Sequence, residues 1–267
     1  MNKKDIAVVV PVYLPTLSDT DKISLEQCLK ILSEYEIIII KPEKLEVKEL
    51  SYYSLSHIET FSDESFASLR AYNKLVLTEG FYRRFLDYKY ILIYQLDAYV
   101  FKDELLFWAK KGYDYIGAPW LPWKKRHLSV VGRLRLSWQR LFCKWFNKKA
   151  FMSDKYYAYK VGNGGFSLRK TSEMLEITIH YKDKIDRLLD DNAAFYPEDI
   201  FLLHELTDKK YKLKKPGFKE ALRFAVEENP DWAYSYNKKQ LPFGCHAWYH
   251  KDYYPFWKSV IRLNNLG

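Results

Sequence analysis

Residues 90–101 read YILIYQLDAYVF, and this stretch decides the fold class. From Tyr90 to Leu96 it is an apolar run with the length and composition of a strand buried on both faces of a sheet. The run ends at Asp97, so a carboxylate directly follows a buried strand. Such strands occur in parallel sheets covered by helices, and these sheets bind ligands beyond the carboxyl ends of their strands. The stretch therefore predicts an α/β fold and makes Asp97 a candidate site residue.

The rest of the chain continues this alternation of strand and helix. Helical spacing of apolar residues is found from about 19 to 32 and from about Ser65 to Leu86, and a further helix is expected from Thr171 to Leu189. We predict a mixed, mostly parallel Rossmann-type sheet flanked by helices, in a single domain over residues 1–267 with an irregular C-terminal part. The other strands are expected at Ile6–Val12, Glu36–Ile40, Ile58–Phe61, Tyr113–Ala118, Phe166–Leu168, Leu222–Val226 and Phe243–Trp248.

Composition excludes several classes of protein. Of the 267 residues, 48% are hydrophobic and 29% charged, with only ten Gly and ten Pro, which is unlike a disordered or collagen-like chain. No apolar run approaches the roughly 20 residues that span a bilayer, and the N-terminal run is interpreted as a buried strand, not a signal peptide. Cys28, Cys143 and Cys245 are too few and too widely spaced for a disulfide framework or a zinc motif. We therefore expect a cytoplasmic protein.

The positive charge is concentrated in one segment. Lys and Arg number 43 against 34 Asp and Glu, a net charge of +9, yet no acidic residue occurs between Asp114 and Asp154. We interpret residues 120–150 as a basic aromatic segment with a helix that binds an anionic membrane, placing the protein peripherally on the inner face of the cytoplasmic membrane. The alternative is a solvated basic helix that packs on the domain. The segment's basic residues are Lys124, Lys125, Arg126, Arg133, Arg135, Arg140, Lys144, Lys148 and Lys149.

Two motifs in the sequence offer a place for a ligand. Asp97 either faces a ligand or water, or else it caps a nearby helix or holds a loop. The cluster Gly162-Asn163-Gly164-Gly165 either lets a ligand approach the backbone closely or forms an ordinary turn before a strand. It is neither a phosphate-binding loop nor a dinucleotide fingerprint, because the required spacing and lysine are absent.

Two further motifs offer ionisable groups. Glu198 and Asp199 follow Pro197, so they either complement the start of a helix or supply a general base. His246 and His250 are four residues apart, a spacing that suits two ligands on one helix face. Because a strand is predicted there, their rings should have different surroundings, and His246 alone remains a candidate, either as a metal ligand or as a hydrogen-bond donor to phosphate.

The motifs together resemble a known family. The chain contains, in this order, the motifs VVVPVY, YILIYQLDAYVF, YDYIGAPW, VGNGGFSLRK, YPEDIF and LPFGCHAWYH. Over nearly the whole chain, these motifs resemble a bacterial glycosyltransferase-like family catalogued as a domain of unknown function. More broadly they resemble GT-A glycosyltransferases, which transfer a sugar from a nucleotide diphosphate onto a hydroxyl. The resemblance implies a nucleotide-binding half over residues 1–101 and an acceptor and catalytic half over 102–267. It also implies a hexosyltransferase that uses a nucleotide sugar such as a UDP-sugar, in bacterial surface polysaccharide or glycan assembly, with a glycan or lipid-linked glycan as acceptor.

The resemblance further implies which residues form the site. The Asp-x-Asp motif of such enzymes is incomplete here, since Gln95-Leu96-Asp97 lacks the first acid and Asp97-Ala98-Tyr99 lacks the second. A Mg²⁺ or Mn²⁺ ion would bridge the donor phosphates, with Asp97 and His246 as its ligands. The implied donor-binding residues are Pro11, Val12, Tyr13, Asn73, Lys74, Gln95, Asp97, Asn163, Gly164 and Gly165.

The implied catalytic residues are Glu198 and Asp199, with Asp199 as the base of an inverting transfer. A retaining enzyme of the same fold, a non-catalytic carbohydrate-binding protein and a nucleic-acid-binding protein are the alternatives. No nucleic-acid partner is expected, because no motif for binding RNA or DNA is visible. A glycosidase with paired carboxylates fits less well, since the alternating strands and helices at the start of the chain suit nucleotide binding.

Overall fold

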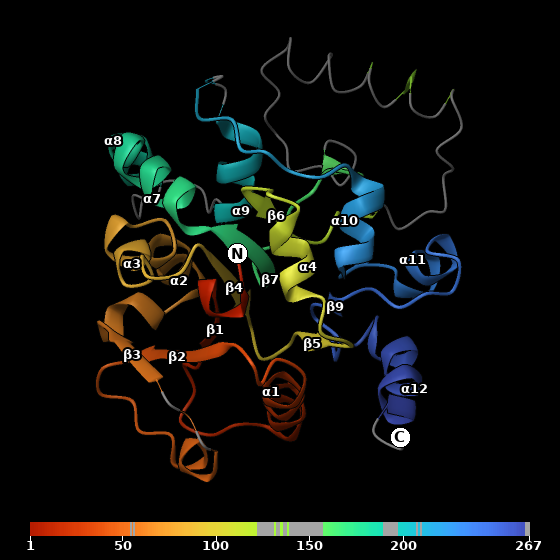
Figure 1. Ribbon diagram of the computed structural model, residues 1–267, viewed down its shortest axis with the longest axis horizontal. Helices are drawn as coiled ribbons and strands as arrows, with labels where there is room; N and C mark the ends of the chain where they lie inside the picture. The colour runs from red at the N-terminus through yellow and green to blue at the C-terminus, as the bar shows by residue number, and fades with distance from the viewer. Residues whose placement is uncertain are drawn as a thin grey trace.

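The structure is a computed structural model that describes residues 1–53, 55, 57–121, 131, 134–135, 138, 157–188, 197–206, 208 and 210–264. Its main sheet has the strand order β3-β2-β1-β4-β7-β6 (Figure 1). The first four of these strands are parallel to one another, whereas β7 runs antiparallel to both β4 and β6. The predicted mixed, mostly parallel sheet is therefore confirmed. The strands are β1 (Ile6–Pro11), β2 (Glu36–Pro42), β3 (His57–Phe61), β4 (Tyr90–Tyr94), β6 (Tyr115–Ile116) and β7 (Phe166–Lys170).

The strand order creates a switch point between β1 and β4. After β1 the chain adds β2 and β3 on one side, and it then returns to place β4 on the other side of β1. Loops leaving two such strands diverge, which opens a crevice at their carboxyl ends. Because β7 is antiparallel to β4, its first residue Phe166 pairs with Tyr94, the last residue of β4. The glycine cluster before β7 is thereby placed beside the residues that follow β4.

Helices cover both faces of this sheet, because its strands bury alternate side chains on opposite sides. On one face, Val8 and Val10 pack in a core with α1 (Asp19–Ile31) and α4 (Leu105–Lys110). On the other face, Val9 packs in a core with α2 (Leu69–Leu75), α3 (Glu79–Arg83) and α7 (Thr171–His180). The arrangement explains why β1 and β4 are buried at every position.

A second, smaller sheet has the order β5-β9-β8 and carries its own apolar core (Figure 1). Its strands are β5 (Tyr99–Val100), β8 (Ala225–Val226) and β9 (Gly244–Cys245). Since β5 begins two residues after Asp97 and β9 ends one residue before His246, this sheet connects two candidate site residues. The remaining elements are η1 (Lys3–Asp5), η2 (Lys48–Tyr52), η3 (Asp63–Phe66), α8 (Lys182–Leu188), α9 (Glu198–Ile200), a π-helical turn (Phe201–Glu205), α10 (Phe218–Phe224), α11 (Pro230–Tyr236) and α12 (Tyr254–Asn264).

Several sequence predictions about these elements were wrong in part, including the helix from Thr171 to Leu189, which is divided into α7 and α8, and the strand at Tyr113–Ala118, of which only β6 is strand. The helix expected from Ser65 to Leu86 is divided into η3, α2 and α3, because the Ser68 and Thr78 side chains accept backbone N–H groups and start new helices. The strand expected at Leu222–Val226 is mostly the end of α10, with only β8 as strand. Similarly, only β9 is strand within Phe243–Trp248.

Most of the basic aromatic segment, residues 120–150, lies outside the described residues. Of the positions that the structure does describe there, Val131, Leu134 and Trp138 are helical and 74%, 56% and 73% exposed. Arg135 is likewise helical and exposed. Across the described parts of the chain, no helix combines the length and apolar character needed to cross a lipid bilayer.

Candidate functional site

Three predicted site residues meet beyond the carboxyl end of β4. Nε2 of His246 lies 3.0 Å from Oδ1 of Asp97 and 3.1 Å from Oε1 of Gln95. The side chains of Asp97 and His246 are 30% and 14% exposed, so the pair can be reached from solvent. Tyr99, by contrast, is fully buried in β5. Of the two ways to align an Asp-x-Asp motif, only Gln95-Leu96-Asp97 directs both of its end residues toward His246.

The two ionisable groups stabilise each other's charged forms. Burial lowers the pKa of His246, but the charge of Asp97 and the hydrogen bonds to Asp97 and Glu227 outweigh it, so this pKa lies well above its ordinary value. Burial raises the pKa of Asp97, and the charge and hydrogen bond of His246 outweigh that effect, so the Asp97 pKa lies below its ordinary value. In the absence of another cation, Asp97 and His246 therefore form an ion pair.

Glu227 is a site residue that the sequence analysis missed. Its Oε1 lies 3.1 Å from Nδ1 of His246, on the side of the ring opposite to Asp97. The available signal was weak: Glu227 directly follows β8, as His246 directly follows β9, and these two strands are parallel neighbours. Their pairing could not be inferred, because a strand of two residues has no periodicity to recognise.

The glycine cluster forms the wall of the site next to these residues. Asn163 has a left-handed backbone (φ 66°), and its Oδ1 accepts the N–H groups of Gly165 and Phe166 at 3.0 and 3.2 Å. A side chain at Gly165 would place its first carbon 2.0 Å from Nε2 of His246, and one at Gly164 would meet Oε1 of Glu198 at 2.1 Å. The glycines are therefore required by the close approach of site side chains to the backbone.

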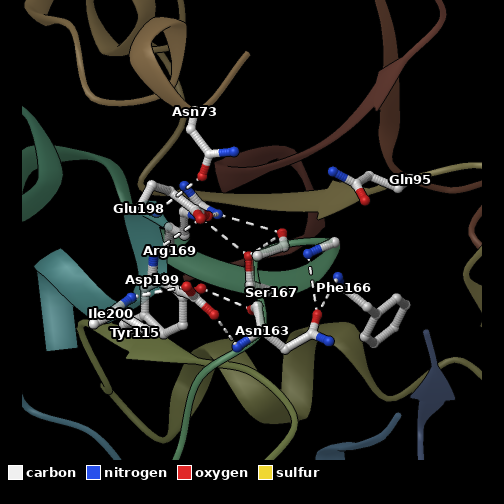
Figure 2. Close-up of polar contacts among 12 residues, drawn as sticks. Asn73, Gln95, Tyr115, Asn163, Phe166, Ser167, Arg169, Glu198, Asp199 and Ile200 are labelled. Carbon is white, nitrogen blue, oxygen red and sulfur yellow. Dashed lines mark hydrogen bonds and ion pairs between the residues drawn. The ribbon is translucent and has the colours of Figure 1, made fainter. Parts of the chain in front are cut away.

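Below the glycine loop lies a buried ion pair between Arg169 and Glu198. Nη2 of Arg169 donates to Oε1 of Glu198 at 2.6 Å, and the side chains are 1% and 8% exposed (Figure 2). The same guanidinium donates to the hydroxyls of Ser167 and Tyr82 and to the carbonyl of Gly164. The pair consequently fixes the position of the loop from beneath.

Asp199 is buried and bonded to backbone. Its Oδ2 accepts the N–H of Asn163 at 2.6 Å, and its Oδ1 accepts the N–H of Ile200 at 2.8 Å (Figure 2). Burial, together with the charge of Glu198, raises the pKa of Asp199 to about 8 against the lowering effect of these two hydrogen bonds. Asp199 thus lies directly under the Asn163 turn, as Glu198 lies under Gly164.

The other predicted donor-binding residues are distributed around this centre. Pro11 and Val12 are buried at the end of β1, where the Val12 N–H donates to the Ile40 carbonyl. Tyr13 is 57% exposed, and partial burial together with the charges of Asp97 and Asp21 raises its pKa, which places it near Asp97.

Two residues of α2 were also predicted to bind the donor. Asn73 is buried, and its amide is engaged with protein groups: it accepts the Glu198 N–H at 2.9 Å and donates to the Leu69 carbonyl (Figure 2). Lys74 is exposed. Asn73 therefore connects α2 to the first residue of α9, and of these two only Lys74 is available on the surface.

The donors at His246 fit a divalent cation. A carboxylate oxygen, an amide oxygen and an imidazole nitrogen all suit Mn²⁺, and the oxygens suit Mg²⁺. The separations of 3.0 and 3.1 Å from Nε2 of His246 are those of adjacent ligands around an octahedral ion with bonds of roughly 2.1 Å. No three His, Cys, Asp or Glu side chains form a metal cluster within the described ranges, because Glu227 approaches the opposite nitrogen of the ring. Any ion would therefore depend on Gln95 and on phosphate or water ligands as well.

Two solved structures of the galactosyltransferase LgtC show the same fold, and a third glycosyltransferase structure is less similar. The galactosyltransferase LgtC, in complex with donor and acceptor sugar analogues, aligns with a TM-score of 0.54 and 12% identity over 97% of this chain and 94% of LgtC. An active-site mutant of LgtC aligns with a TM-score of 0.54 and 14% identity over 97% and 95% of the two chains. A glycosyltransferase involved in the glycosylation of the major capsid of PBCV-1 aligns with a TM-score of 0.49 and 9% identity over 98% and 99%.

At these identities the LgtC matches show the fold, which is GT-A-like. No curated protein matches the chain. A model of one protein family matches residues 56–246, a range that includes β4, the glycine loop, α9 and His246. The chain therefore belongs to the family described as "Protein of unknown function (DUF5672)", and it has the GT-A-like fold that its sequence motifs suggested.

Proposed function

We propose that the chain is a glycosyltransferase that moves a sugar from a nucleotide-diphosphate donor to a hydroxyl of a glycan or lipid-linked glycan. The reaction would belong to bacterial surface polysaccharide or glycan biosynthesis. The observation that supports this most is the meeting of Gln95, Asp97 and His246 with the loop of residues 163–165 at the switch point between β1 and β4. The GT-A-like fold agrees with it.

The charges at this point favour a donor that arrives with a divalent cation. The described side chains that contact His246 are Asp97, Gln95, Asn163 and Glu227, and none of these four carries a positive charge. Arg169 is buried and engaged with Glu198. Among these described groups the positive charge can come only from His246, and that charge is paired with Asp97, so a pyrophosphate beside Asp97 would be repelled unless a further cation offset its charge. A Mg²⁺ or Mn²⁺ ion held by Gln95, Asp97 and His246 would offset the charge that develops on the departing nucleoside diphosphate.

The chain's own residues would orient the donor around this centre. Tyr13 is exposed near Asp97, so its ring is available for stacking on the base of the nucleotide. The backbone of Gly164 and Gly165 is fixed by Arg169 and Asn163 and would form a rigid floor under the sugar. Fixed groups of this kind would align the anomeric carbon of the donor with the acceptor oxygen without further loss of entropy at the moment of reaction.

Two stereochemical courses follow from the surroundings of Asp199. A carboxylate whose pKa is raised to about 8 suits a general base near neutral pH, which favours an inverting transfer with Asp199 as base beside Glu198. Asp199 is, however, buried, and both its oxygens accept N–H groups, from Asn163 and Ile200. Because these contacts restrict its access to an acceptor, they favour a retaining transfer instead. In that course the departing phosphate oxygen takes the proton of the acceptor, and Asp199 holds the Asn163 turn.

The experiment that tests the proposal is a panel of UDP- and GDP-sugars, assayed with and without Mn²⁺. We expect at least one donor to raise the melting temperature and to be consumed, because a ligand that binds the folded state stabilises it. Asp97→Ala should lower turnover about 100-fold or more, since charge stabilisation at a metal site is worth several kcal/mol. Asp87→Ala is the matched control. Asp87 is exposed and precedes the first residue of β4, at the end of the strand opposite to Asp97.

Three results separate the alternatives. If no nucleotide sugar binds or reacts while free glycans bind, the chain is a carbohydrate-binding protein and the proposal is wrong. If a donor reacts, NMR of the product's anomeric proton assigns inversion or retention. Retention together with residual turnover in Asp199→Ala would remove Asp199 from the role of base.

A further inference from the structure

Glu227 and His246 are held side by side by the backbone of the small sheet. Strands β8 and β9 are parallel, and Val226 pairs with Cys245, so the residues that follow each strand are neighbours. The N–H of His246 also donates to the carbonyl of Val226 at 3.0 Å. The contact between the two side chains is therefore set by strand pairing and does not depend on a mobile connection.

The contact joins the nitrogen of His246 that faces away from Asp97. Oε1 of Glu227 lies 3.1 Å from Nδ1, whereas Asp97 and Gln95 approach Nε2. A neutral imidazole carries one proton, so Nε2 can offer a lone pair to a cation only when the proton is on Nδ1. That proton then requires an acceptor, and the Glu227 carboxylate is in position to be one.

A second group beside Nδ1 favours the opposite arrangement. Because Oδ1 of Asn163 accepts the N–H groups of Gly165 and Phe166, the amide orientation is fixed and its Nδ2 is directed toward His246 (Figure 2 shows the two bonds). Nδ2 lies 3.0 Å from Nδ1 of His246 and can only donate there. Without Glu227, the hydrogen bond from Asn163 would favour an unprotonated Nδ1. The imidazole proton would then lie on Nε2, where it would block a cation.

We propose that Glu227 is the positioning residue of the cation site: it accepts the Nδ1 proton of His246 and so presents the Nε2 lone pair to a divalent cation beside Asp97. The inference rests on the cation site of the proposed function and adds to it a residue outside the Asp-x-Asp motif. Carboxylates that hold a ligating histidine in this way commonly change metal affinity by about 10- to 100-fold.

Direct Mn²⁺ binding tests the role of Glu227 without an assay of turnover. Titration calorimetry or the EPR signal of free Mn²⁺ gives Kd for the parent chain, Glu227→Leu and Glu227→Gln. The Leu variant removes the acceptor at similar volume, so Kd should rise about 10- to 100-fold. The Gln variant keeps a neutral acceptor, so it should recover part of this affinity and remain about fivefold weaker than the parent.

The chain contains a matched control in a second histidine–carboxylate pair. Nδ1 of His250 lies 3.7 Å from Oδ2 of Asp252, and both side chains are more than 40% exposed. Asp252→Asn should leave the Mn²⁺ Kd unchanged. Melting temperatures without metal establish that each variant is folded, and if the Leu variant fails to fold, the Gln variant decides the question.

The outcomes are distinguishable. A Glu227→Leu chain that is folded and binds Mn²⁺ with the parent Kd overturns this inference alone, as does an unchanged Kd in Glu227→Gln when only that variant folds. A parent chain that binds no Mn²⁺ overturns the cation site and this inference together. Donor turnover in such a metal-free parent would leave the proposed transferase function intact.

Discussion

The Arg169–Glu198 pair shows what a single residue contributes beneath this site. Arg169→Met should destabilise the fold by about 3–5 kcal/mol, because it leaves the buried Glu198 carboxylate without its cation. Urea unfolding followed by circular dichroism measures the change. The control is Arg83→Met, since Arg83 pairs with Glu79 on the exposed surface of α3 and its loss should cost less than about 1 kcal/mol.

Removing both partners tests the explanation. Arg169→Met with Glu198→Leu should recover part of the lost stability, since no buried charge then lacks a partner. If Arg169→Met costs no more than the Arg83 control, the pair does not support the loop in the way described.

At this scale, sequence reasoning found site residues that stand in motifs and missed those whose role depends on contacts between distant segments. Asp97 and His246 were predicted as a pair, and the structure places them 3.0 Å apart. Glu227 and Arg169 were not predicted. Arg169 occupies a position in β7 that reads as ordinary polar strand, and only the neighbouring α9 shows that its charge is buried and paired.

Among the elements, the loop of residues 163–165 gives the sharpest prediction. Gly165→Ala should weaken Mn²⁺ binding strongly, because the new methyl group would meet Nε2 of His246 and Oε1 of Gln95 and force them apart. Gly80→Ala is the matched control, since a side chain at Gly80 meets nothing within 4 Å and Ala favours its helix.

Calorimetric titration of Mn²⁺ into both variants measures the Kd of each. We expect the Gly80 variant to retain the parent Kd. An unchanged Kd for Mn²⁺ in the Gly165 variant would mean that His246 and Gln95 are not the ligands of the ion.

How well an element could be predicted depended on its length. The strands β1 and β4 and the four isoleucines of β2 form continuous apolar runs, so their burial on both faces could be predicted from the sequence. The two-residue strands β5, β8 and β9 owe their existence to pairing with distant segments, and no local pattern encodes them. The break between α2 and α3 depends on hydroxyl caps that compete with a continuous apolar stripe.

For the molecule as a whole, we propose a single domain. Strands β6 and β7 come from the part of the chain after residue 101, yet they complete the sheet that β1 to β4 begin. A boundary near residue 101 would therefore cut through one hydrophobic core, since Val8 and Phe166 belong to the same cluster.

Membrane binding also concerns the whole molecule. We propose that the basic aromatic segment, residues 120–150, binds anionic lipid. Sedimentation with phosphatidylglycerol vesicles should exceed that with phosphatidylcholine alone. Reversal of Arg133, Arg135 and Arg140 to Glu should lower the partition coefficient more than about 100-fold, because each basic residue near such a surface contributes about 1 kcal/mol. Equal binding by this variant and by one with Lys44, Lys48 and Lys110 reversed would refute the proposal.

The short ladder between β5 and β9 has a consequence for how the site responds to its ligands. Tyr99 pairs with Cys245, and the N–H of Trp248 donates to the carbonyl of Asp97 at 3.0 Å, so main-chain bonds alone set the spacing between Asp97 and His246. The proposed cation site would thus be assembled during folding, before any ion binds. If the proposed site holds a cation, binding and release would proceed on a rigid frame, and adaptation to different sugars would fall to the surrounding loops.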